Sequence, residues 1–152
     1  MVCYSLKCPQ LNSIYEMKRF NKIVLIDDDV ISNMVFEKLS TASGLTQELI
    51  TIISPLDALV FFENLPTVEL PDAIFLDIKM PILSGWEFLT QFKQISRIES
   101  VKVFIISSSV NYYDIQRAEK ENAISSFISK PISMRKLLDI KNQFSTELGE
   151  SA

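Results

Sequence analysis

The chain has 152 residues, of which 47% are hydrophobic and 22% are charged, and its formal net charge is −4. This composition fits a single globular domain. The acidic balance, with no block of lysine or arginine, lacks the basic footprint of a nucleic-acid-binding protein. The sequence contains no histidine, which excludes a histidine base, nucleophile or phosphocarrier within this chain.

The first residues, 1–19, mix polar, aromatic and cysteine residues without a period. We interpret them as an N-terminal extension that is either disordered or the product of a mis-set start, with Met17 as the alternative start. Cys3 and Cys8 are too few to close a zinc site and fit reduced thiols in a reducing compartment. No stretch is long and apolar enough for a membrane span or a secretion signal. We therefore expect a cytoplasmic protein without membrane insertion.

From Phe20 the pattern becomes regular, and short apolar runs alternate with amphipathic stretches. Apolar runs bounded by polar turn residues predict buried strands, and apolar residues at helical spacing predict helices. Ser54 and Ser133 each precede a helical stretch and can cap it. The predicted elements are, in chain order, a strand at 23–26, a helix at 31–42, a strand at 49–53, a helix at 54–65, a strand at 73–76, a helix after the loop at 78–84, a strand at 101–106, a helix at 114–121, a strand at 126–129 and a helix from 133 to about 148.

Three of these helices carry apolar residues at helical spacing that we expect to face the core. They are Met34, Val35 and Leu39 in the first helix, Trp86, Leu89 and Phe92 in the third, and Met134, Leu137, Leu138 and Phe144 in the last. The pattern predicts one domain over 20–148 and a tail over 149–152. Because the last helix is predicted to end close to the C-terminus, we expect no attached effector domain.

Five strand–helix units in a row predict an α/β fold with a parallel sheet and helices on both faces. In such sheets, ligands bind at the carboxyl ends of the strands. Reactive side chains follow four of the predicted strands at that end. They are Asp27 and Asp28 after the first strand, Asp77 after the third, Ser107 after the fourth and Lys130 after the fifth.

Carboxylates gathered at one rim repel each other by about 1–4 kcal/mol per pair at 4 Å, and a hard divalent cation removes this cost. Mg²⁺ binds a few carboxylate and carbonyl oxygens and keeps several waters, so we predict Mg²⁺, or Mn²⁺ in its place. A carboxylate beside such a cation can attack phosphorus, while a lysine and a hydroxyl bind the phosphoryl oxygens. Lys130 precedes Pro131, where a cis peptide bond is accessible and would turn the lysine inward.

The stretch 22–148 resembles the receiver domain of two-component response regulators, in particular stand-alone, chemotaxis-regulator-like members. The resemblance rests on four motifs in the right order: IDDD at 26–29, FLDIKMP at 75–81 followed by Gly85, ISS at 106–108, and FISKP at 127–131. Each motif alone is weak, but the four together are specific. The resemblance implies a flavodoxin-like, doubly wound fold with strand order 2-1-3-4-5.

The resemblance also implies roles at the matching positions. Asp77 would be the phosphoacceptor. Asp28 would bind the metal directly, Asp27 largely through water, and the backbone carbonyl of Lys79 would be a further ligand. The phosphoryl-binding and switch residues would be Ser107, with the small Ser108 after it, Lys130, and Phe127 as the aromatic that turns inward. Ser107 stands where threonine is more frequent.

These roles predict a phosphorylation-dependent switch without conventional enzyme activity beyond assisting its own phosphotransfer and autodephosphorylation. A partner histidine kinase or histidine phosphotransfer protein must donate the phosphoryl group, since this chain has no histidine. We expect a monomer or weak dimer that contacts an unknown target protein or relays the phosphoryl group onward. Contacts of this kind commonly involve the fourth and fifth helices and the fifth strand in the family that the chain resembles.

Three other functions are weighed against this one. A receiver-like docking module that works without phosphate is disfavoured by the complete set of acidic residues, hydroxyl and lysine. A phosphatase with an aspartate nucleophile usually carries a second acid two residues later, where this chain has Lys79. A nucleotide or flavin binder needs a glycine-rich phosphate loop, whereas the three glycines here are widely separated.

Overall fold

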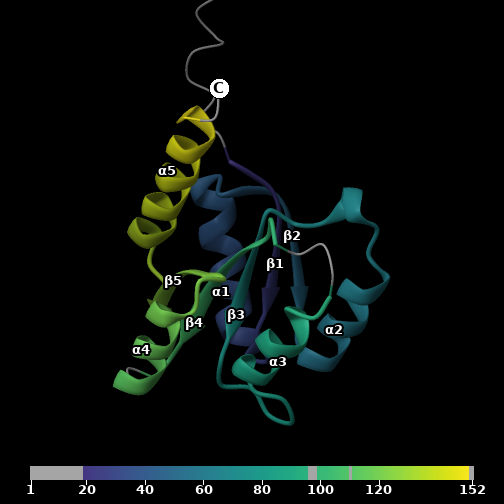
Figure 1. The fold of residues 1–152 in the computed structure, drawn as a ribbon. Coiled ribbons are helices and arrows are strands. Elements are labelled where there is room, and N and C mark those ends of the chain that lie inside the picture. The colour runs from purple at the N-terminus through teal and green to yellow at the C-terminus, as the bar shows by residue number, and fades with distance from the viewer. Residues whose placement is uncertain (1–18, 96–98, 110, 151–152) are drawn as a thin grey trace, which may run out of the picture.

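The computed structural model describes residues 19–95, 99–109 and 111–150, so Cys3, Cys8 and all but the last residue of the predicted extension lie outside the described part. Five parallel strands form one sheet in the order β2-β1-β3-β4-β5, as predicted (Figure 1). The strands are β1 (Phe20–Ile26), β2 (Thr46–Ile52), β3 (Ala73–Asp77), β4 (Lys102–Ser107) and β5 (Ile124–Ser129).

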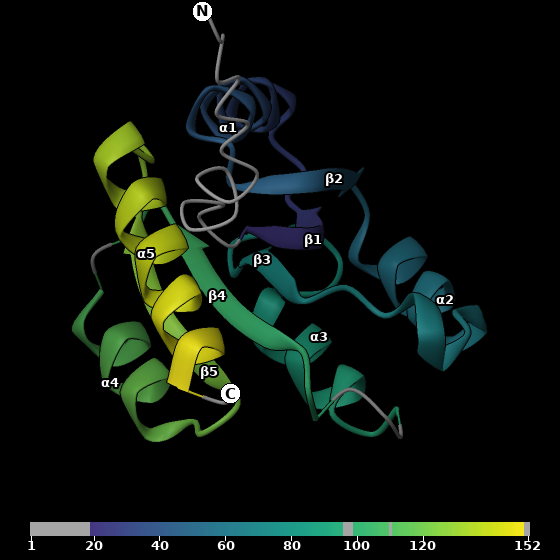
Figure 2. The same ribbon diagram turned by 90° about the horizontal axis from the view of Figure 1, so that it is seen from above.

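Helices cover both faces of this sheet. Seen from above, α1 and α5 lie on one side of the strands and α2 and α3 on the other (Figure 2), while α4 packs against β5. The bounds are α1 (Val30–Ser43), α2 (Pro55–Asn64), α3 (Gly85–Phe92), α4 (Tyr112–Lys120) and α5 (Met134–Glu150), with a short 3₁₀ turn at Thr67–Glu69. None of the helices in the described ranges combines the length and apolar character needed to span a membrane.

The helices begin where side chains can cap them. Asp29 accepts hydrogen bonds from the first amides of α1, and Ser54 does the same for α2. Ser84 and Glu87 form a reciprocal capping box at the start of α3, and Ser133 accepts a hydrogen bond from the Lys136 amide of α5. These contacts satisfy amide groups that have no partner within the helix, and they confirm the caps predicted at Ser54 and Ser133.

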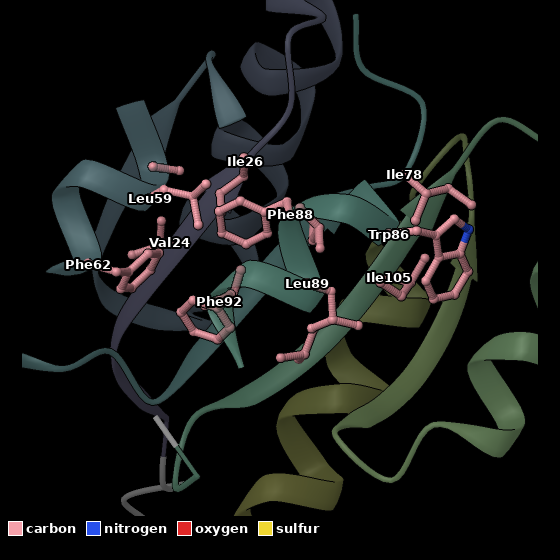
Figure 3. Close-up of a cluster of buried hydrophobic side chains, with 14 of the residues drawn as sticks. Val24, Ile26, Leu59, Phe62, Ile78, Trp86, Phe88, Leu89, Phe92 and Ile105 are labelled. Carbon is pink, nitrogen blue, oxygen red and sulfur yellow. The ribbon is translucent and has the colours of Figure 1, made fainter. Parts of the chain in front are cut away.

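The core is divided by the sheet into two apolar clusters. Figure 3 shows the cluster beneath α2 and α3, where Phe62, Phe88 and Phe92 pack over Val24 and Ile26 of β1. On the other face, Phe75 and Phe104 of neighbouring strands stack with ring centroids 4.8 Å apart. Every residue of β3 is buried, as expected for a central strand of a parallel sheet.

The predicted faces of two helices need correction. In α1, Met34 and Val35 are 52% and 45% exposed, and the helix is turned so that Phe36 is buried 4.9 Å from the ring of Phe75. Apolar residues lie on several sides of α1, so their periodicity could not identify the buried side. The side that carries the larger Phe36 ring is the one that is buried. In α5, Leu137 and Phe144 are buried as predicted, but Leu138 is exposed.

The outer bounds of the domain also differ from the prediction. Helix α5 continues to Glu150, so the predicted tail at 149–152 begins inside a helix. The apolar face of Trp86, Leu89 and Phe92 in α3 is buried as predicted. Strand bounds agree with the predicted ranges to within three residues at either end.

Candidate functional site

The pairing register of the sheet aligns the carboxyl ends of β1, β3, β4 and β5 at one edge. Ile26 of β1 pairs with Leu76 of β3, so Asp27 and Asp77 are neighbours at the carboxyl edge. Asp77 pairs in turn with Ile106 of β4, and the amide of Lys130 donates to the carbonyl of Ser107. Side chains separated by about a hundred positions in the sequence therefore meet at one rim, as predicted.

Lys130 is the centre of the site. Its ammonium lies 2.5 Å from Oδ2 of Asp27 and 2.7 Å from Oδ2 of Asp77. The three side chains are 12%, 1% and 6% exposed, respectively. The Lys130–Pro131 peptide bond is cis, as predicted. The ammonium thus bridges two buried carboxylates that would otherwise repel each other.

Backbone amides hold the second oxygen of each carboxylate. The Asp29 amide donates to Oδ1 of Asp27 at 2.9 Å, and the Lys79 amide donates to Oδ1 of Asp77 at 2.8 Å. Both amides lie two residues after the carboxylate that they bind, in turns of the Asx type. The turns therefore fix both carboxylates before any ligand arrives. The predicted metal-binding role of the Lys79 carbonyl stays a prediction.

The third acid of the site is open to solvent. Asp28 is exposed, and its carboxylate offers an oxygen within 4.8 Å of oxygens from Asp27 and Asp77. Three carboxylates at this spacing supply the hard oxygen ligands that Mg²⁺ prefers. The donor set therefore fits a divalent cation. Asp29, by contrast, uses its side chain to cap α1.

Burial and neighbouring charges alter the proton affinities of the central pair. Burial raises the pKa of Asp77 above its ordinary value and outweighs the hydrogen bonds from Lys130 and the Lys79 amide that lower it. For Lys130, burial lowers the pKa, but the hydrogen bonds to Asp27 and Asp77 outweigh it and the net pKa is raised. Without a bound metal, the ionised form of Asp77 therefore lowers the free energy of unfolding.

Replacing Asp77 with asparagine should stabilise the metal-free protein. A raised carboxyl pKa means that the folded chain holds the proton more tightly, so stability is lost as the pH rises from the ordinary carboxyl range through the raised pKa. At neutral pH we therefore expect Asp77→Asn to raise the free energy of unfolding, measured by urea denaturation in EDTA.

The pH dependence and a surface variant provide the controls for this prediction. The gain of Asp77→Asn should shrink as the pH is lowered toward the ordinary carboxyl pKa, because the wild-type side chain then becomes protonated. Asp139→Asn, at an exposed position of α5, should give no comparable gain. A metal-free Asp77→Asn protein less stable than wild type at neutral pH would contradict the electrostatic account.

The predicted switch residues differ in their burial and in the contacts that they make. Ser107 is fully buried at the end of β4, and its Oγ accepts a hydrogen bond from the Ser109 amide at 3.0 Å. Ser108 is exposed. Phe127 is half-buried against the cluster beneath α3 and lines a cavity beside α4. In this structure the Ser107 hydroxyl is thus bound to the loop that follows it, whereas the Lys130 ammonium contacts the Asp77 carboxylate directly.

Asn33 is a supporting residue that the sequence prediction missed. It lies in the first turns of α1, is buried, and donates from Nδ2 to the backbone carbonyl of Asp27 at 2.8 Å. This bond ties the acidic turn after β1 to α1. Its Oδ1 is buried without a hydrogen-bond partner among the described residues. An isolated amide in a helix carries no periodic signal, so only the tertiary structure reveals the contact.

Gly85 lets α3 begin directly against the acceptor strand. A Cβ atom at this position would lie 2.4 Å from the carbonyl oxygen of Asp77 and 2.6 Å from Cα of Ile78. The Gly85 amide also donates to the Ile78 carbonyl at 3.2 Å. The start of α3 therefore packs directly against the backbone of Asp77 and Ile78, which fixes the position of the Asp77 side chain.

Comparisons with known proteins agree with this arrangement. Residues 23–142 match the family model for the response regulator receiver domain. The polar-differentiation response regulator DivK of Brucella ovis is 27% identical over 117 residues, which cover 77% of this chain and 89% of that protein. The hybrid signal transduction histidine kinase L of Dictyostelium discoideum is 28% identical over 84% of this chain, and the sensor histidine kinase CheAY of Helicobacter pylori is 26% identical over 73%.

The match covers only part of the two kinases, 7% and 13% of their lengths respectively. Among solved structures, a two-component response regulator from Cytophaga hutchinsonii superposes with a TM-score of 0.78 and 26% identity, covering 86% of this chain and 99% of that one. A response regulator receiver protein from Dyadobacter fermentans gives 0.71 and 28%, covering 81% and 96%. The chain therefore belongs to the response regulator receiver domain family of two-component signalling.

Proposed function

We propose that this chain is a phosphorylation-dependent signalling switch that accepts a phosphoryl group on Asp77. The observation that carries the proposal is the Lys130 ammonium bound between two buried carboxylates, with a third carboxylate facing solvent beside them. A site built only for stability would not need three acids at one rim, since replacing buried ion pairs by apolar residues is often neutral or stabilising.

In the transfer step, a carboxylate oxygen of Asp77 attacks the phosphorus of a phosphohistidine on a partner protein. A P–O bond forms, the P–N bond breaks, and the imidazole leaves with the electron pair. The Lys130 ammonium, already 2.7 Å from Asp77, neutralises charge on a phosphoryl oxygen. Asp27, Asp28, Asp77 and the Lys79 carbonyl would hold Mg²⁺. Such an ion, when bound, supplies the charge neutralisation that the acidic rim needs.

The switch follows from the new charge at Asp77. A phosphoryl group adds strong acceptor oxygens, and the Ser107 hydroxyl, which accepts from the Ser109 amide at the end of the neighbouring strand, is a donor that can turn to it. The change would shift the loop after β4 and the cavity beside Phe127. We propose that target proteins read this change by direct contact, or that the phosphoryl group is relayed onward.

The setting of this function is also part of the proposal. The donor is a histidine kinase or histidine phosphotransfer protein, because this chain contains no histidine. The protein acts in the cytoplasm as a monomer or weak dimer. It catalyses no reaction beyond its own phosphorylation and dephosphorylation.

Incubation with acetyl phosphate and Mg²⁺ tests the phosphoacceptor function. We expect the intact mass of the wild type to increase by one phosphoryl group, with little increase in EDTA and none in Asp77→Asn. Asp29→Asn is the matched control, because Asp29 lies beside the site but caps α1, and it should still be phosphorylated. No mass gain in the wild type would favour the phosphate-independent docking module instead.

A further inference from the structure

The single tryptophan of the chain lies between the acceptor loop and helix α4. Trp86 is the second residue of α3 and is 9% exposed. Figure 3 shows its indole beside Ile78, which follows Asp77, and Ile105 of β4. Trp86 follows Gly85, whose amide donates to the Ile78 carbonyl and at which an added Cβ atom would lie 2.4 Å from the Asp77 carbonyl oxygen.

The polar edge of this indole is bound by α4. Nε1 of Trp86 donates to Oδ1 of Asp114 at 2.9 Å, and the guanidinium carbon of Arg117 lies 4.3 Å from the ring centroid. Asp114 and Arg117 are three residues apart on α4 and so share one face of the helix. We call these three residues the Trp86 clasp. The Trp86–Asp114 bond spans 28 positions of sequence, and together the contacts join α3 to α4.

A second connection between the site and α4 runs through the loop after β4. The Ser109 amide donates to Oγ of Ser107, and the Asn111 amide donates to Oγ of Ser109 at 3.3 Å. Asn111 is the N-cap of α4. If the Ser107 hydroxyl turns to a phosphoryl group, the Ser109 amide loses its acceptor, and Ser109 is the residue that in turn binds the Asn111 amide. A shift of Ser109 would thus be passed to Asn111 and would move Asp114, one turn further along, relative to Trp86.

We propose that the Trp86 clasp is a positioning device that holds α4 in the arrangement of the unphosphorylated protein. Trp86 packs beside Ile78 of the acceptor loop, and Asp114 lies one turn after the N-cap that the loop following Ser107 binds, so the clasp joins the two elements that phosphorylation would displace. This inference rests on the proposed function. By linkage, an interaction that favours the unphosphorylated state weakens phosphoryl binding by the same factor.

Binding of beryllofluoride, a mimic of the phosphoryl group, in the presence of Mg²⁺ tests this device. We expect Asp114→Ala to bind beryllofluoride about two- to tenfold more tightly than the wild type, the factor that corresponds to one net hydrogen bond. Asp114→Asn keeps an acceptor for Nε1 and should bind with nearly wild-type affinity. Arg117→Gln removes the contact over the ring and should tighten binding in the same direction.

The matched control is Glu119→Ala, which removes an exposed carboxylate from the same helix without touching Trp86. Emission of the single tryptophan provides a second readout. Beryllofluoride should change the emission of the wild type, and the spectrum of unliganded Asp114→Ala should already differ from that of the wild type. A merely structural role of Asp114 would lower stability without tightening the binding of the phosphoryl mimic.

Two negative results have different meanings. Wild-type protein that fails to bind beryllofluoride would overturn the proposed function and this inference with it. Binding to the wild type with equal affinities for Asp114→Ala, Arg117→Gln and Glu119→Ala would overturn the inference alone. All three substitutions lie on α4, outside the site.

Discussion

Replacing Lys130 with methionine should lower the free energy of unfolding in EDTA by about 2–4 kcal/mol, since removing one partner of a buried ion pair leaves an uncompensated charge. The substitution keeps most of the side-chain volume but removes the ammonium that lies 2.5 Å from Asp27 and 2.7 Å from Asp77. Two buried carboxylates would then face each other without a cation. Urea denaturation monitored by circular dichroism measures the loss.

Mg²⁺ should recover a large part of this loss, because a bound divalent cation supplies the missing positive charge to the same carboxylates. The recovery distinguishes an electrostatic role of Lys130 from a packing role, which Mg²⁺ would not replace. Lys79→Met, at an exposed position beside the site, is the control and should change stability by less than about 0.5 kcal/mol. Equal stability of Lys130→Met and wild type in EDTA would show that the Lys130 ammonium does not stabilise the two buried carboxylates.

Gly85→Ala is expected to slow phosphorylation of Asp77 by about a hundredfold, the scale associated with misplacing a reacting group by about 1 Å. The added methyl would lie 2.4 Å from the Asp77 carbonyl oxygen, so the backbone of the acceptor must shift. We also expect a loss of about 1–3 kcal/mol in the free energy of unfolding from overpacking. The rate is measured with acetyl phosphate and Mg²⁺, and the stability with urea.

The sign of the stability change makes this prediction specific. At an ordinary helical position, Gly→Ala stabilises by about 0.5–1 kcal/mol, so a loss must come from contact with the acceptor strand. Gln91→Ala, at an exposed position of the same helix, should alter neither rate nor stability appreciably. A Gly85→Ala protein that is more stable than wild type and equally fast would show that the close packing behind Asp77 is not required.

The rim site could be predicted from the sequence because its residues stand at strand ends. An apolar run that ends in an acid, a serine or a lysine indicates a strand with a polar residue at its carboxyl end. Parallel pairing then brings these ends together at one edge of the sheet. Asp27, Asp77 and Lys130 therefore meet as expected. The strand order, by contrast, could be predicted only from the resemblance to a known family.

Contacts that depend on the rotation of a helix or on the direction of one hydroxyl could not be predicted. Met34 and Phe36 compete for the buried side of α1, and only packing against Phe75 decides between them. The Ser107 hydroxyl binds the amide two residues later, whereas the motif implied a contact to phosphoryl oxygens. Trp86 and Asp114 are paired across two elements without any repeating pattern.

The most direct test of the central claim is to locate the phosphoryl group. After incubation with acetyl phosphate and Mg²⁺, borohydride reduction converts an aspartyl phosphate into a stable product that peptide mass spectrometry can assign to a residue. We predict the modification at Asp77 in the wild type and at no residue in Asp77→Asn. Modification at another residue of the wild type, or labelling that persists in Asp77→Asn, would contradict Asp77 as the phosphoacceptor.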